Sequence, residues 1–110
     1  MEESDLDASC SGSDADDPEC YEEHLFKREG LNVIKNHAKN NPTDPLFYFH
    51  SFHLVHTPLN VPNSYLKKID EVIEPYRFDS ESRRNYSAMV LYMDDVVNEL
   101  VGELKTQVSL

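Results

Sequence analysis

Several classes of protein are excluded by what this sequence lacks. No stretch approaches the roughly 20 consecutive apolar residues that a membrane-spanning helix needs, so we expect no membrane span. The N-terminus has no basic region followed by an apolar run, so no signal peptide is predicted. The chain also has no nucleophile elbow, no Gly-rich phosphate loop and no C-x-x-C pair. Its 110 residues are enough for one small domain.

Basic residues are missing from one end of the chain. Residues 1–23 contain ten Asp or Glu and no Lys or Arg, so they carry nearly all of the net charge of −11. The remainder is almost neutral and has no basic stripe for phosphate contacts, which argues against a nucleic-acid partner. Residues 1–20 have one Leu, two Ala and no aromatic side chain, and we predict a disordered acidic leader there. A calcium-binding or partner-binding tail is the sharper alternative, but the D-x-D-x-D-G order of a calcium loop is absent.

Cysteine is scarce, and both copies, Cys10 and Cys20, fall inside the leader. They could close a small loop in an oxidising compartment. Two cysteines in such a segment indicate little about the compartment in which the protein works.

The region from residue 21 onward is predicted to begin as half of an α/β unit. Residues 21–40 have a loosely helical apolar pattern that ends at the Asn- and Pro-rich run NHAKNNPTDP. Residues 46–52, LFYFHSF, are aromatic-rich without alternation, which indicates a strand covered on both faces. A helix, a turn and a buried strand together predict the α/β class for residues 21–110.

The rest of the chain is predicted to be a loop followed by helices. Pro58 and Pro62 make residues 56–63 a loop, after which Asn63 or Ser64 could cap a short helix. Residues 83–105 give the clearest helical pattern, and Met89 and Met93 lie on its apolar stripe, which favours a core role for both. The stripe consists of Tyr86, Met89, Val90, Met93, Val96, Val97, Leu100, Val101 and Leu104.

One buried strand cannot satisfy its own backbone, because both of its edges carry unpaired N–H and C=O groups. The sequence contains no second convincing strand. We therefore interpret it as incomplete as an independent fold. A helix hairpin that clasps one apolar segment is the alternative.

Three histidines follow one another at positions 50, 53 and 56, and a metal cluster is one hypothesis for them. On a strand, however, His50 and His56 would point to one face and His53 to the other. His56 is the best single candidate because it lies just past a strand end, where ligands bind in α/β sheets, although the spacing alone favours a structural histidine.

Two other motifs are weaker. Asp94 and Asp95 diverge by about 100° on a helix and so do not form a catalytic dyad. The sequon at residues 85–87 is not expected to be occupied, because Tyr86 lies on the apolar stripe.

Three segments together carry a specific resemblance. They are His24-Leu25-Phe26, the run PLFYFHSFHLVHTPLNVPNSYL at 45–66, and RRNYSAMVLYMDD at 83–95. In order and spacing they resemble the arylsulfatase branch of the sulfatase family, with the arylsulfatase B type closest, over residues 21–105. The resemblance implies a large α/β domain like that of alkaline phosphatase, of which this chain would be one central strand with flanking helices. It also implies hydrolysis of sulfate esters on sulfated small molecules or glycans, in lysosomes or outside cells.

The resemblance implies a calcium ion and a formylglycine made from the cysteine of a C-x-P-S-R motif. The histidine of the family's H-x-P loop lies near the substrate sulfate, and it matches His56 here. This chain contains no C-x-P-S-R motif and lacks the metal-binding Asp pair, and Asp94 is expected to be structural. We therefore expect a fragment of a sulfuric ester hydrolase that is inactive alone. The alternative is a non-catalytic interaction module that uses the acidic tail and the amphipathic helix to bind itself or a parent protein.

Overall fold

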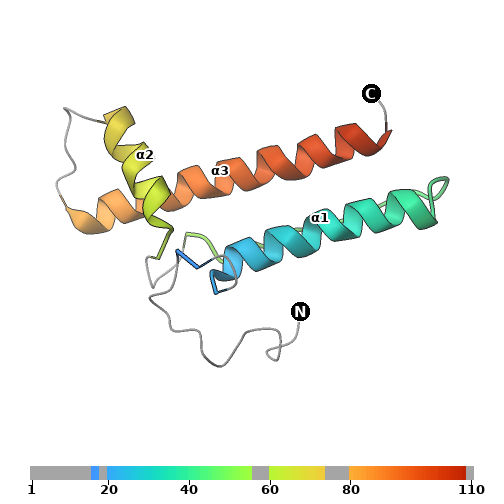
Figure 1. Ribbon diagram of the computed structural model, residues 1–110, viewed down its shortest axis with the longest axis horizontal. Coiled ribbons are helices and arrows are strands. Elements are labelled where there is room, and N and C mark those ends of the chain that lie inside the picture. The colour runs from blue at the N-terminus through green and yellow to red at the C-terminus, as the bar shows by residue number, and fades with distance from the viewer. Residues whose placement is uncertain (1–15, 18–19, 56–59, 74–79, 109–110) are drawn as a thin grey trace.

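Within the residues that the computed structural model describes (16–17, 20–55, 60–73 and 80–108), the chain forms three α-helices, and an extended segment follows the first of them. They are α1 (Glu22–Asn40), α2 (Asn63–Ile73) and α3 (Glu81–Val108). Helices α1 and α3 lie side by side with the same chain direction, and α2 packs across the first half of α3 (Figure 1). In this part of the chain no helical stretch combines the length and hydropathy that crossing a bilayer requires.

The helix predicted over residues 21–40 is confirmed as α1, and its ends follow from local chemistry. Tyr21 is extended, and Glu22 and Glu23 follow it in the first turn, where carboxylates stabilise the positive end of the helix dipole. His37 and Lys39 occupy the last turn, where basic groups are favourable. The Asn41 N–H then bonds back to the His37 carbonyl at 2.8 Å and ends the helix.

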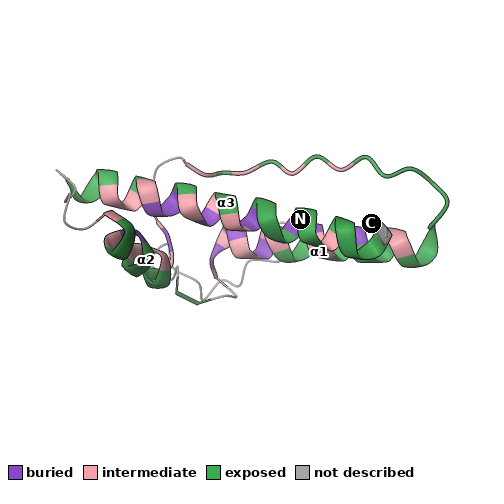
Figure 2. Ribbon diagram, turned by 90° about the horizontal axis from the view of Figure 1, so that it is seen from above, coloured by how far each residue is buried: buried purple, intermediate pink, exposed green. Residues whose placement is uncertain are grey.

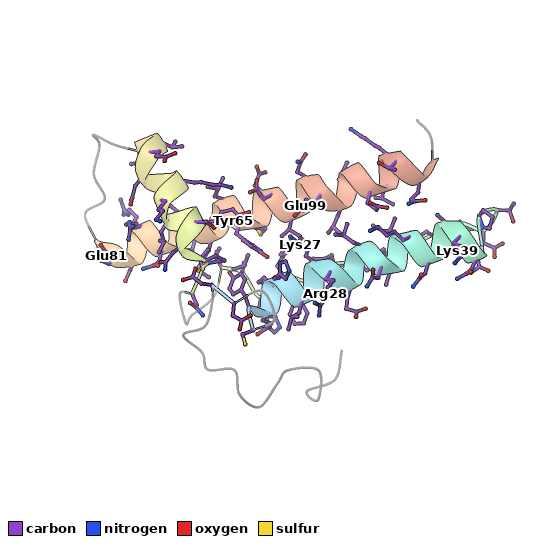
Figure 3. All side chains as sticks on the ribbon, in the orientation of Figure 1. Lys27, Arg28, Lys39, Tyr65, Glu81 and Glu99 are labelled. Atoms are coloured by element: carbon purple, nitrogen blue, oxygen red, sulfur yellow. The ribbon has the colours of Figure 1, made fainter. Side chains whose placement is uncertain are left out.

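The core lies between α1, α2 and one face of α3. Met89 and Val96 of α3 are its largest fully buried side chains, which confirms the core interpretation of Met89. Lys27 of α1 pairs with Glu99 of α3 at 3.0 Å, and the two face each other across the helix pair (Figure 3). The remaining buried apolar residues are Tyr21, Leu25, Ile34, Val61, Ile69, Ala88, Tyr92 and Leu100.

The apolar stripe predicted on residues 83–105 is buried only in part. Its inner half packs into the core, but its outer half remains 39–47 % exposed. Helix α3 therefore has an apolar stripe wider than α1 and α2 can cover, as the alternating buried and exposed residues along it indicate (Figure 2). The outer half consists of Tyr86, Val90, Val97, Val101 and Leu104.

The predicted central strand is wrong for the described residues, and so is the α/β fold with one central strand and flanking helices. Residues 45–53 are extended, but no described residue pairs with them in a ladder. The segment runs back alongside the helices, which lie on one side of it (Figure 2). A strand is made by hydrogen bonds to its neighbours, and the described part of the chain supplies none.

The prediction that this segment is covered on both faces is also wrong. Tyr48, His50, Phe52 and Leu54 are half-buried, whereas the residues between them are exposed. Phe47 is 91 % and Phe49 77 % exposed, so the face turned away from the helices is uncovered. The segment has the side-chain alternation of a β-strand without a sheet.

Gly30 explains how closely the segment approaches the helices. A Cβ at Gly30 would lie 2.5 Å from Tyr48 Oη and 3.2 Å from Leu100 Cδ2. Glycine normally weakens a helix interior, but here it lets the extended segment and α3 meet α1 at one point.

Candidate functional site

The predicted site residue His56 lies in residues 56–59, which are outside the described part of the structure. The chain on both sides of it is described, with His53–Val55 before it and Asn60–Asn63 after it. The geometry of these two flanks therefore defines the candidate site.

The first flank is held by the start of α1. Glu23 is buried, only 3 % exposed, and its Oε1 accepts a hydrogen bond from the His53 N–H at 2.8 Å. The neighbouring Glu22 carboxylate forms an ion pair with His53 Nδ1. Two successive acids of α1 thus contact the backbone and the ring of one residue in the extended segment.

Glu23 is a buried carboxyl with incomplete hydrogen bonding. Its Oε2 has no hydrogen-bond partner among the described residues. Burial raises the pKa of Glu23, and the hydrogen bond from the His53 amide opposes that shift. The protonated form of this side chain is therefore stabilised relative to an exposed glutamate.

The second flank is held by residues that precede α1. Tyr21 Oη donates a hydrogen bond to the Asn60 carbonyl at 3.0 Å. Asn63, the first residue of α2, donates from its backbone N–H to Asp16 Oδ1 and from Nδ2 to Asp16 Oδ2, each at 2.6 Å. Helix α2 has no acid in its own first turn, so Asp16 supplies the capping carboxylate from far away in the sequence.

Behind the second flank, three tyrosines pack edge to face. The Tyr21 and Tyr92 ring centroids are 5.1 Å apart, and those of Tyr65 and Tyr92 are 5.0 Å apart. Burial raises the pKa of all three phenols. They line a hollow of about 200 Å³ together with Asp16, His24, Lys27, Pro62 and Ser64.

Asp94 and Asp95 do not act as a pair. Tyr65 Oη donates to Asp95 Oδ2 at 2.7 Å, and Lys68 Nζ lies 3.8 Å from the same oxygen. Asp94 is exposed. As predicted, the two carboxylates diverge on the helix, and Asp95 joins α3 to α2.

The spacing predicted His50 and His53 on opposite faces of a strand, but both residues line one groove against α1, and His56 lies outside the described residues. His50 faces the helices, its Nδ1 lies 2.7 Å from Tyr48 Oη, and burial lowers its pKa. The His53 side chain is 69 % exposed, and its ring lies against the start of α1, with its centroid 5.5 Å from that of Phe26. An open groove of about 490 Å³ between α1 and the segment touches both rings. Among the described residues no three His, Cys, Asp or Glu side chains come together as metal ligands, and His56 lies outside that test.

The residues present do not fit the calcium ion and formylglycine that the family resemblance implies. Cys20 is disulfide-bonded, while Cys10 lies outside the described residues. Cys20 is followed by Tyr-Glu-Glu and not by x-Pro-Ser-Arg. No step of a mechanism can therefore be assigned through either group in this chain.

Sequence reasoning missed the residues that hold the two flanks. It assigned residues 1–20 to a solvated leader, whereas Asp16 caps α2. The sequence predicted that Asn63 or Ser64 caps this helix. In the structure Asn63 instead donates hydrogen bonds to the Asp16 carboxylate, which acts as the cap. Only two weak features of the sequence could have indicated these contacts. Helix α2 has no acid in its first turn, and α1 begins with two acids.

Comparisons with known proteins agree on the family. The family model described as Sulfatase matches residues 3–110. Arylsulfatase J of Mus musculus is 26 % identical over 85 residues, which cover 77 % of this chain and 13 % of that protein. The chain thus spans about 13 % of the length of this curated relative. No solved structure matches. Because the family model extends over nearly the whole chain, the protein belongs to the sulfatase family.

Proposed function

We propose that this chain supplies a substrate-binding histidine, His56, to a sulfate-ester site and does not hydrolyse sulfate esters by itself. The observation that carries the proposal is the sulfatase match over residues 3–110, which includes the H-T-P-L run at 56–59. The described flanks support it, because both ends of the connection that contains His56 are tied to the start of α1 and the residues before it.

A histidine suits a sulfate ester for electrostatic reasons. An imidazole N–H donates a hydrogen bond to an anionic oxygen, and a protonated ring adds a full positive charge. The substrate class that we propose is an aryl sulfate or a sulfated glycan. The narrower specificity that we propose, the arylsulfatase B type, is supported only by the H-T-P-L and M-D-D motifs.

The proposed inactivity follows from missing chemistry. Ester transfer requires an activated nucleophile and charge stabilisation at the leaving group. The sequence has no C-x-P-S-R, and Cys20 is disulfide-bonded. Calcium and formylglycine therefore belong, in this proposal, to longer family members and not to this chain.

The test combines a turnover assay with a binding assay on the purified chain. We expect no hydrolysis of an aryl sulfate ester, with or without added calcium. We expect the same ester, used as a titrant, to shift the NMR signals of the His56 ring. His56→Ala should abolish the weak binding, and the matched control His37→Ala should retain it because His37 lies in the last turn of α1, away from both flanks.

Two results would count against the proposal. Turnover that survives a chelator and is lost in His56→Ala would show that the chain is catalytic alone. Binding that is unchanged in His56→Ala would assign the anion contact to a residue other than His56.

A non-catalytic interaction module is the second candidate, and the outer half of the α3 stripe favours it. Val90, Val97, Val101 and Leu104 are 39–45 % exposed and recur at helical spacing, which suits packing against a second apolar helix. We expect the double substitution Val97→Glu and Val101→Glu to shift a dimer toward monomer in sedimentation equilibrium. A wild-type chain that is monomeric at all concentrations would eliminate this candidate.

A further inference from the structure

Residues 16–23 contact both ends of the connection between the extended segment and α2. Glu22 and Glu23 bind His53 at its beginning. Tyr21 binds Asn60, and Asp16 binds Asn63 at its end. We name Asp16, Tyr21, Glu22 and Glu23 the acidic clamp.

The clamp contacts are long-range, so they are not a by-product of local helix geometry. They join residues that are 30, 39 and 47 positions apart in the sequence. Each contact must outweigh the entropy of ordering two distant pieces of backbone. Asp16 precedes α1 and receives two hydrogen bonds of 2.6 Å from Asn63, which is a bidentate arrangement with both carboxylate oxygens used.

We propose that Asp16 and Tyr21, with Glu22 and Glu23 at the other end, are positioning residues that fix the two ends of the connection carrying His56. The inference rests on the proposed function only in naming His56 as the residue that is positioned. One residue of the acidic leader then has a role within the fold: Asp16 holds one end of the connection, and its carboxylate faces the positive end of α2.

Asp16 gives the sharpest test because both of its carboxylate oxygens accept hydrogen bonds from Asn63, and an amide of the same shape can accept only one of them. In Asp16→Asn, one carboxylate oxygen becomes an NH2 group facing an N–H donor of Asn63. Loss of a helix cap corresponds to roughly two- to thirtyfold faster opening. We expect hydrogen exchange of the amides at Asn63 and Ser64 to accelerate by about that factor, while the amides in the middle of α3 exchange as before.

Three further variants of the full chain make the experiment specific. Asp16→Glu keeps the carboxylate and should restore part of the protection. Tyr21→Phe removes only the hydroxyl that binds the Asn60 carbonyl, so the fold should survive even if Asp16→Asn does not. Asp44→Asn is the matched control, because this exposed acid lies just beyond the C-terminal end of α1 and its hydrogen bonds, to His37 and Asn41, are made by its backbone.

A second readout separates positioning from general stability. We expect Asp16→Asn and Tyr21→Phe to change the NMR signals of the His56 ring, and the response of that ring to inorganic sulfate, at a temperature where exchange in the middle of α3 shows that each variant is folded. Asp44→Asn should leave both signals as in the wild type.

The outcomes distinguish the clamp from the proposed function. If Asp16→Asn and Tyr21→Phe leave the Asn63 exchange and the His56 signals unchanged, the clamp is wrong. If these variants alter both, but His56 of the wild type does not respond to sulfate or to an aryl sulfate, the clamp stands and the proposed substrate contact fails.

Discussion

The long helix α3 and the extended segment at residues 45–55 are both rich in apolar side chains, yet they reach very different states. Helix α3 satisfies its backbone internally and buries one face, with Met89 and Val96 fully enclosed. The extended segment has no ladder partner among the described residues, and Phe47 and Phe49 project into solvent.

The difference shows what each kind of element needs from its surroundings. A helix needs one apolar surface to pack against, whereas a strand also needs a neighbour along each edge. The face of the segment that includes Tyr48 and Phe52 packs against the helices and is half-buried. Burial of the opposite face, with Phe47 and Phe49, would require further polypeptide beyond the described residues.

The largest expected effect is in α3. Met89→Ala removes a side chain that is only 2 % exposed and leaves a cavity, which should lower the free energy of unfolding by about 2–5 kcal/mol. For a domain this small, such a loss is enough to populate the unfolded state. Urea denaturation followed by circular dichroism measures it.

Phe49→Ala is the matched change in the extended segment. Because Phe49 is 77 % exposed, we expect the free energy of unfolding to change by no more than about 0.5 kcal/mol. A loss comparable to that of Met89→Ala would mean that the outer face of the segment is covered in solution, and the contrast between the two regions would then disappear.

The next effect is at Gly30, where the two regions meet. Gly30→Ala gains up to about 1 kcal/mol of helix propensity but places a Cβ 2.5 Å from Tyr48 Oη, and overpacking costs about 1–3 kcal/mol. We expect a net loss of about 1 kcal/mol in thermal or urea denaturation.

Two controls identify the cause of that loss. Tyr48→Phe removes the closest atom, so Gly30→Ala should cost less in that background, although the contact with Leu100 Cδ2 at 3.2 Å remains. Gly102→Ala in α3 has no atom within 4 Å of the added Cβ and should stabilise the protein by up to about 1 kcal/mol. A stabilising Gly30→Ala in the wild-type background would show that the segment does not pack on α1 as described.

The sequence was a good guide where structure depends on local pattern. The helical spacing of α3, the stop after Asn40 and the core role of Met89 all follow from properties of neighbouring residues. The same pattern could not divide the α3 stripe into its buried and exposed halves, because that division depends on how much surface α1 and α2 present.

Features that depend on contacts between distant residues could not be predicted from the sequence. The strand interpretation of residues 46–52 was wrong: the aromatic run is extended, but the described residues include no neighbouring strand to pair with it. The contacts of Asp16 with Asn63 and of Glu23 with His53 join residues 47 and 30 positions apart. The spacing of apolar residues along a helix or strand contains no information about such pairs. The position of His56 was predicted from family motifs and stays a prediction.

The smallest expected effect, and the one that most sharpens the comparison, is the pH dependence contributed by Glu23. Burial raises the folded-state pKa of Glu23 above its unfolded value, so the folded protein binds this proton more tightly than the unfolded chain does. The stabilisation that Glu23 contributes is therefore present at low pH and is lost as the pH rises through the raised pKa.

Glu23→Gln should remove this dependence while keeping an acceptor oxygen for the His53 amide. We expect the variant to equal or slightly exceed the wild type in thermal stability near neutral pH, and to lose the wild type's gain on acidification. Glu22→Gln is the control, since its carboxylate is more exposed and pairs with the exposed His53 ring. If Glu23→Gln is clearly destabilised at neutral pH, the charged carboxylate holds the extended segment on α1 more strongly than a neutral acceptor oxygen can.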